Sequence, residues 1–187
     1  MTAPDDPLVQ VNLVGIELDL GLYDEARARG EQLVAKADGP LLLIALDALA
    51  GVLAAQKDRL ALARLVDILE DEATGLSTHA AVFRTAQIAW MSGRPEVALE
   101  LLQSIVDSVP DEARLAGLVL AARTLSAEIR SDEAELVQLG KAWGALGRKA
   151  NAIRCLALAG RLPSPDEAIA WAESRGLAPL VEELRKR

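Results

Sequence analysis

The stretch GRPEVA, from Gly93 to Ala98, contains the pattern that decides the fold, a glycine followed five residues later by an alanine. The same spacing recurs from Gly21 to Ala26 and from Gly147 to Ala152. Glycine readily adopts the left-handed backbone conformation that ends a helix, and alanine is small enough for two helices to touch. The recurrence predicts helical hairpins that stack along the chain.

Composition favours an all-α protein. The chain has 187 residues, of which 51% are hydrophobic and only 3% aromatic. Its apolar residues are mostly Ala, Leu and Val, and the period-two alternation of β-strands is missing. We therefore expect helices throughout, in one domain or one continuous solenoid.

Charge and apolar patterning exclude several partners and locations. The net charge of -8 opposes binding to nucleic acid and to anionic lipid. The acidic N-terminus does not resemble a secretory signal, and the longest apolar stretch, residues 41–55, contains Asp47 and is too short to span a bilayer. With one cysteine no intrachain disulfide can form, which fits a reducing compartment, so we expect a cytoplasmic protein.

Helix start and stop signals divide the chain into units. Asp6-Pro7 predicts the first helix start, and Ser164-Pro165-Asp166-Glu167 predicts a capping box. In the second hairpin Asp58 takes the place of the glycine, with Ala63 five residues later. We expect about eleven helices in a single domain over 1–187, with units 7–39, 41–74, 77–110, an extra helix 111–130, 132–162 and capping helices 165–187.

Two phrases resemble tetratricopeptide repeats. One combines Leu139-Gly140 and Trp143 with Gly147, Ala152 and Ala159, and the other runs from Gly93 to Pro110. The resemblance implies antiparallel helix pairs stacked as a right-handed superhelical α-solenoid. It also implies a concave surface that binds proteins or peptides.

The segment from Leu136 onward also resembles the end of the helical sensor arm of large ATP-dependent bacterial transcription activators. Such proteins carry a nucleotide-binding domain before the arm and a DNA-binding domain after it. No phosphate-binding loop motif occurs in this sequence. The resemblance implies a bacterial protein, which is either a fragment of a larger regulator or a protein that shares only its style of repeat.

No residue set predicts catalysis, a cofactor or a metal site. The single histidine, His79, and the single cysteine, Cys155, lie far apart in sequence, and we expect a structural role for His79 and burial as a small hydrophobe for Cys155. Too few ligands exist for a structural zinc site. The acidic residues at 67 and 70–72 lack the glycine of a calcium loop and favour a solvated helix end.

The first candidate binding site lies on the first helix of the third hairpin. Phe83, Gln87, Trp90 and Met91 recur there at spacings of three and four. Tryptophan and methionine supply large, adaptable apolar contacts at interfaces. The alternative is that Phe83 and Trp90 pack between adjacent repeats. Because cations are lacking at the matching positions of the other first helices, we expect an apolar peptide or short helix rather than a clamped carboxylate.

The second candidate is a basic stretch. Lys141, Arg148, Lys149 and Arg154 occur with no acidic residue between them in an otherwise acidic chain. They are suited to an acidic partner segment, and the alternative is a solvated helix face.

The sequence therefore predicts a noncatalytic protein-interaction scaffold or adaptor that binds a peptide or helix in a concave groove. The alternative is a sensor or regulatory domain that binds a small molecule or signal peptide. The apolar residues 41–55 require a cover, either from the additional helices or from a second copy of the chain in a homodimer.

Overall fold

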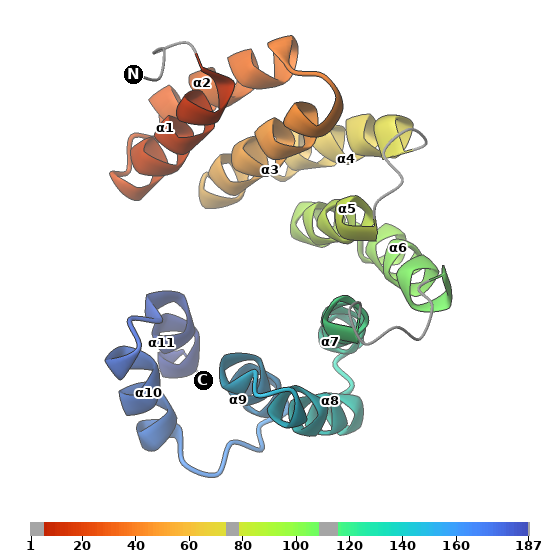
Figure 1. Cartoon of the computed structure of the whole chain (residues 1–187), viewed down its shortest axis with the longest axis vertical. Coiled ribbons are helices and arrows are strands. Elements are labelled where there is room, and N and C mark those ends of the chain that lie inside the picture. The colour runs from red at the N-terminus through yellow and green to blue at the C-terminus, as the bar shows by residue number, and fades with distance from the viewer. Residues whose placement is uncertain (1–5, 74–78, 109–115, 187) are drawn as a thin grey trace. The chain divides into compact units, whose positions relative to one another are not determined.

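The computed structural model describes residues 6–73, 79–108 and 116–186, and in these ranges it contains eleven α-helices and no strand (Figure 1). The all-α prediction is confirmed at this level. Contacts between residues divide the chain into two compact units, residues 1–101 and 102–187, with the boundary inside α6. No described helix combines the length and the apolar character that a membrane crossing requires.

The first unit contains α1 to α5 and the first half of α6. The bounds are α1 (Pro7–Asp19), α2 (Tyr23–Lys36), α3 (Gly39–Ala55), α4 (Arg59–Ala73), α5 (His79–Ser92) and α6 (Pro95–Ser108). Each of the first four helices packs against the next, and in addition α1 packs against α3 and α3 against α5. The first helices of successive hairpins are therefore neighbours.

Helix α3 is the centre of the first unit. Seven of its apolar residues are buried, namely Leu42, Ala45, Leu46, Leu49, Ala50, Val52 and Leu53. Helices α1, α2, α4 and α5 provide the cover that the sequence requires for this stretch. The homodimer stays a prediction. Helix α3 begins at Gly39, because Pro40 fits the first turn of a helix.

The second unit contains α7 (Ala116–Arg130), α8 (Glu133–Ala145), α9 (Lys149–Leu158), α10 (Pro165–Ser174) and α11 (Ala178–Arg185). Helix α7, the predicted extra helix, pairs with α8, and residues 109–115 of that predicted unit lie outside the described residues. Helix α8 packs against α9, which also contacts α10 and α11. One core cluster comprises Ala127, Leu136, Leu139, Trp143, Cys155 and Ala159.

The glycine turns have the geometry that the sequence predicts. Gly21, Gly93 and Gly147 all have positive φ, from 70° to 84°. After α1 the N–H of Gly21 donates to the carbonyl of Leu18 at 3.0 Å, and the N–H of Leu22 donates to that of Glu17 at 2.8 Å. This pair of bonds satisfies carbonyls at the helix end.

The second turn differs from the prediction by one residue. The left-handed residue is Lys57, with φ 56°, and not Asp58. The carboxylate of Asp58 instead caps α4 by accepting a hydrogen bond of 3.0 Å from the N–H of Ala61. The fifth residue is then the buried Leu62 and not Ala63. With this correction the left-handed positions 21, 57 and 93 are evenly spaced, at 36 residues.

Helix caps follow the sequence in one case and depart from it in another. Asp6 caps α1, accepting a hydrogen bond of 2.9 Å from the N–H of Leu8. The predicted capping box at Ser164 is wrong, because its side chain makes no bond to α10. Pro165 occupies the first turn of that helix as expected.

Two helical glycines allow close contact between helices. A Cβ atom on Gly30 of α2 would lie 3.1 Å from Cδ1 and 3.3 Å from Cβ of Leu49. One on Gly140 of α8 would lie 3.4 Å from the carbonyl oxygen of Ala152. The absence of a side chain at these positions sets the spacing of α2 and α3 and of α8 and α9.

Candidate functional site

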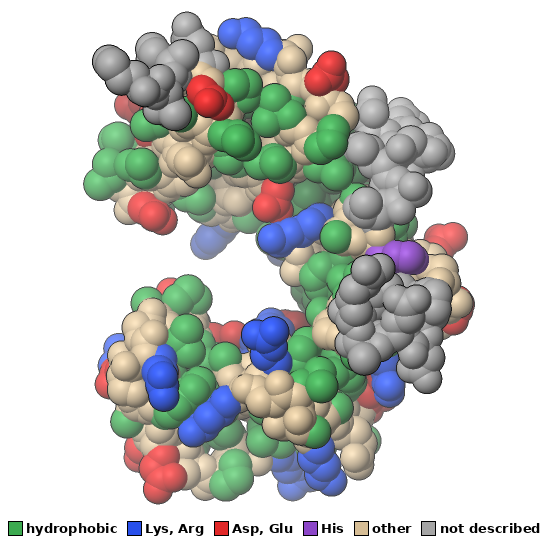
Figure 2. Space-filling view, viewed as in Figure 1, with side chains coloured by type: hydrophobic (Ala, Val, Ile, Leu, Met, Phe, Trp, Pro, Cys, Tyr) green, Lys and Arg blue, Asp and Glu red, His purple; other side chains and the backbone are tan. Residues whose placement is uncertain are grey.

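The predicted site residues of α5 lie at two levels of exposure. Trp90 is 37% and Met91 40% exposed, whereas Phe83 and Gln87 are half-buried. Trp90 and Met91 therefore offer apolar surface to solvent. The side chains of Phe83 and Gln87 are only partly accessible. On the face shown in Figure 2, hydrophobic side chains (green) also form much of the surface over α1 and α3.

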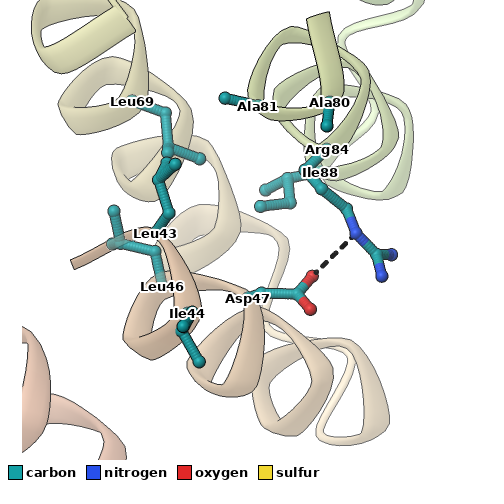
Figure 3. Close-up of a pocket in the computed structure, with 9 residues that line it drawn as sticks. All are labelled: Leu43, Ile44, Leu46, Asp47, Leu69, Ala80, Ala81, Arg84 and Ile88. Carbon is teal, nitrogen blue, oxygen red and sulfur yellow. Dashed lines mark ion pairs between the residues drawn. The ribbon is translucent and has the colours of Figure 1, made fainter. Parts of the chain in front are cut away.

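A pocket opens between α3, α4 and α5 (Figure 3). Its volume is about 220 Å³. The lining residues are Leu43, Ile44, Leu46, Asp47, Leu69, Ala80, Ala81, Arg84 and Ile88. All belong to the first unit.

The pocket has a buried apolar floor and an exposed rim. The floor comprises Leu46, Leu69, Ala81 and Ile88, none more than 5% exposed. Ile44, which is 41% exposed, and Ala80 belong to the rim. An apolar group that entered the pocket would lose contact with water on the side of the floor and keep it at the rim.

One ion pair stands at the rim. The Nε atom of Arg84 lies 3.6 Å from Oδ1 of Asp47, and the two side chains are 57% and 47% exposed. Nη1 of Arg84 donates a hydrogen bond of 2.9 Å to the amide oxygen of Gln87. In Figure 3 the terminal nitrogens of Arg84 point away from the apolar floor. The bond to Gln87 thus holds one nitrogen of this exposed guanidinium, and among the described residues no other short hydrogen bond to it is formed.

The pocket and the predicted site share a helix but have different residues. Ala80, Arg84 and Ile88 line the pocket, whereas Phe83, Trp90 and Met91 do not. Gln87 joins the two sets through its bond to Arg84. Sequence reasoning missed the pocket, although one signal was present: Asp47 is the only charged residue in the apolar stretch 41–55.

A second depression of about 360 Å³ lies among α1, α2 and the start of α3, where Gln10, Arg29, Gln32 and Lys36 are among its lining residues. The guanidinium of Arg29 is paired with the carboxylate of Glu17, at 2.6 Å between Nη2 and Oε1. Glu17 therefore neutralises Arg29, one of the two cations that line this depression.

The predicted basic stretch is dispersed in the second unit. Nη2 of Arg154 lies 2.9 Å from a carboxylate oxygen of Glu128, and its Nε lies 3.1 Å from one of Glu183. Burial disfavours the charged form of Arg154, but the two carboxylates outweigh it and raise its pKa. Arg154 therefore joins α7, α9 and α11 and is no open docking cation.

The other three cations of the stretch are exposed. The ammonium of Lys149 lies over the ring of Trp171, 4.6 Å from its centroid, which is cation–π geometry. Lys141 lies on α8 and Arg148 in the turn before α9. The stretch thus contains one arginine with an internal role and three surface cations.

The two residues weighed for nucleophilic chemistry are separate. Cys155 is fully buried, as predicted, and burial raises the pKa of its thiol. His79 is half-buried at the start of α5, in the other unit. Asp67 pairs with Arg94 at 2.7 Å, whereas the side chains of residues 70–72 lie outside the described residues. Among described residues, no group of acidic, His or Cys side chains forms a metal site.

Comparisons with known proteins identify no relative. No protein-family model, curated protein or solved structure matches the chain.

Proposed function

We propose that this chain is a noncatalytic adaptor whose first unit binds a peptide or short helix of a partner protein, with one apolar side chain of the partner held in the pocket between α3 and α5. The observation that carries the proposal is the combination of a buried floor of leucine, isoleucine and alanine with an exposed rim. Interfaces draw most of their binding energy from anchors in such pockets.

The arrangement of helices supports a tetratricopeptide-like reading of the first unit. Left-handed turns recur every 36 residues at 21, 57 and 93, close to the 34 residues of that repeat class. Helix α3 contacts both α1 and α5, so the first helices of successive hairpins lie next to one another. In stacked helical repeats such a surface is used for binding.

The size of the pocket favours a side chain over a free small molecule. Pockets for drug-sized ligands usually measure about 300 to 1,000 Å³ and enclose most of the ligand. The pocket here measures about 220 Å³ and opens at its rim. We therefore rank the alternative, a sensor domain for a small molecule, second. Within this pocket the polar chemistry is one arginine–aspartate pair, which suits recognition more than catalysis.

Selection of peptide binders tests the proposal. A phage library of helical peptides of about 15 residues is selected on the full chain, and the enriched peptides are measured by calorimetry against Ala80→Trp. Ala80 is an exposed rim residue, so the indole fills the entrance without changing the floor. We expect affinity to fall at least tenfold.

The matched control is Ala28→Trp, the same change at an exposed position of α2 outside both pockets. Thermal unfolding establishes that both variants are folded. Equal binding to wild type and Ala28→Trp, with loss in Ala80→Trp, supports the adaptor. Peptides that bind all three proteins equally would refute the pocket as the site.

A further inference from the structure

We infer that Arg84 sets the specificity of the pocket, so that the preferred partner is a helix with an apolar anchor and an Asp or Glu residue three or four positions away. This inference depends on the proposed peptide-binding function and adds the charge of the partner. The rim pair of Arg84 and Asp47 carries it.

The intramolecular pairing of Arg84 is incomplete. Its Nε lies 3.6 Å from Oδ1 of Asp47, beyond the usual length of a hydrogen bond. Among the described residues only Nη1 has a short bond, 2.9 Å to the amide oxygen of Gln87. A guanidinium has five N–H donors, so most of its capacity remains for a ligand.

The guanidinium is also oriented for a partner. Gln87 fixes one nitrogen, and the terminal nitrogens point away from the floor (Figure 3). Arginine binds carboxylates through two parallel N–H bonds, a geometry that a lysine lacks. Orientation before binding reduces the entropy that complex formation costs.

The spacing of anchor and charge follows from helix geometry. Residues three or four apart lie on the same face of a helix. A partner helix whose apolar side chain enters between Ala81 and Ile88 therefore places its neighbouring carboxylate at the rim, where Arg84 stands. Asp47 competes for the same guanidinium and repels that carboxylate, so it moderates the affinity.

A charge exchange tests the inference. One peptide selected as above is made with Glu, Gln or Lys at the position one turn from its apolar anchor, and each form is measured by calorimetry. We expect the Glu form to bind wild type about tenfold more tightly than the Lys form, and Arg84→Glu to reverse this order. Asp47→Asn should strengthen binding of the Glu form severalfold.

The matched control is Arg123→Glu, the same reversal at an exposed arginine of α7 in the second unit, which should keep the order of wild type. Equal binding of the three forms, or an order that survives Arg84→Glu, would overturn the inference. Weaker binding of the Glu form to Asp47→Asn would also overturn it. Failure of the proposed function is a separate result, in which no selected peptide responds to Ala80→Trp.

Discussion

The indole N–H of Trp143 donates a hydrogen bond of 3.0 Å to the hydroxyl oxygen of Thr124, and this bond joins α8 to α7 inside the core of the second unit. The hydroxyl itself donates to the carbonyl of Leu120 at 2.7 Å, and its oxygen lies 3.9 Å from the sulfur of Cys155. A polar group thus occupies an apolar core without loss of hydrogen bonding.

Replacing Thr124 by valine should lower the free energy of unfolding by about 1 to 3 kcal/mol, because the buried indole N–H of Trp143 loses its acceptor. Thr124→Ser keeps the hydroxyl and should retain most of the stability. Urea denaturation of the three proteins measures the difference. A valine variant as stable as wild type would show that the bond contributes nothing.

One substitution should have opposite effects at two helical glycines. Gly30→Ala places a Cβ atom 3.1 Å from Leu49 and should destabilise the chain by about 1 to 3 kcal/mol. Gly15→Ala, where no atom lies within 4 Å, should stabilise it by about 0.5 to 1 kcal/mol. Thermal denaturation of both variants tests the packing of α2 against α3. If both variants change the stability in the same direction, the close packing of α2 against α3 at Gly30 is contradicted.

Replacing Lys57 by glycine tests whether the backbone of this turn is strained. A residue with a Cβ atom in the left-handed region costs about 1 to 2 kcal/mol of strain. Glycine removes this strain but loses more chain entropy on folding, so only part of the strain energy is gained as stability. Lys57→Gly should therefore raise the free energy of unfolding by up to about 1 kcal/mol, whereas Lys57→Ala keeps the Cβ atom and should change little. If chemical denaturation shows that Lys57→Ala is more stable than Lys57→Gly, the backbone at position 57 is not strained.

Acid stability should depend on Asp58. The hydrogen bond from the N–H of Ala61, and then the ion pair with Arg27, lower the pKa of its carboxyl below the usual value. The native state therefore binds this proton less readily than the unfolded state, and the contribution is present above about pH 4. It is lost as the pH falls through the lower native pKa.

The variant for this test is Asp58→Asn, which lacks the titrating group. Its melting temperature should lie below that of wild type at pH 7, and the gap should narrow as the pH falls from 4 toward 2. Thermal unfolding followed by circular dichroism across this range measures the gap. A gap that stays constant would mean that Asp58 does not contribute through its charge.

Local signals in the sequence predict much of the fold. Glycine at 21, 93 and 147 marks helix ends because its backbone alone enters the left-handed region without cost. Lys57 has no such signal, because an ordinary side chain takes the conformation there only under the constraint of the surrounding helices. This explains the error of one residue at that turn.

The candidate site is less predictable because it depends on contacts between distant segments. The sequence indicates exposed Trp90 and Met91 on α5, and both are at the surface. Asp47 and Arg84 lie 37 positions apart and meet only when α3 packs beside α5. Likewise, the sequence around Arg154 contains no acidic residue to pair with it. Its partners Glu128 and Glu183 belong to other helices and meet it only in the fold.

The most direct test of the central claim is methyl nuclear magnetic resonance of the full chain, labelled at Ile, Leu and Val and titrated with a selected peptide. We predict the largest shifts at the methyl groups of Leu43, Ile44 and Ile88, which line the pocket. The methyl groups of Leu146, an exposed leucine of the second unit, should stay in place. Largest shifts at Leu146, with Ile44 and Ile88 unmoved, would contradict the account.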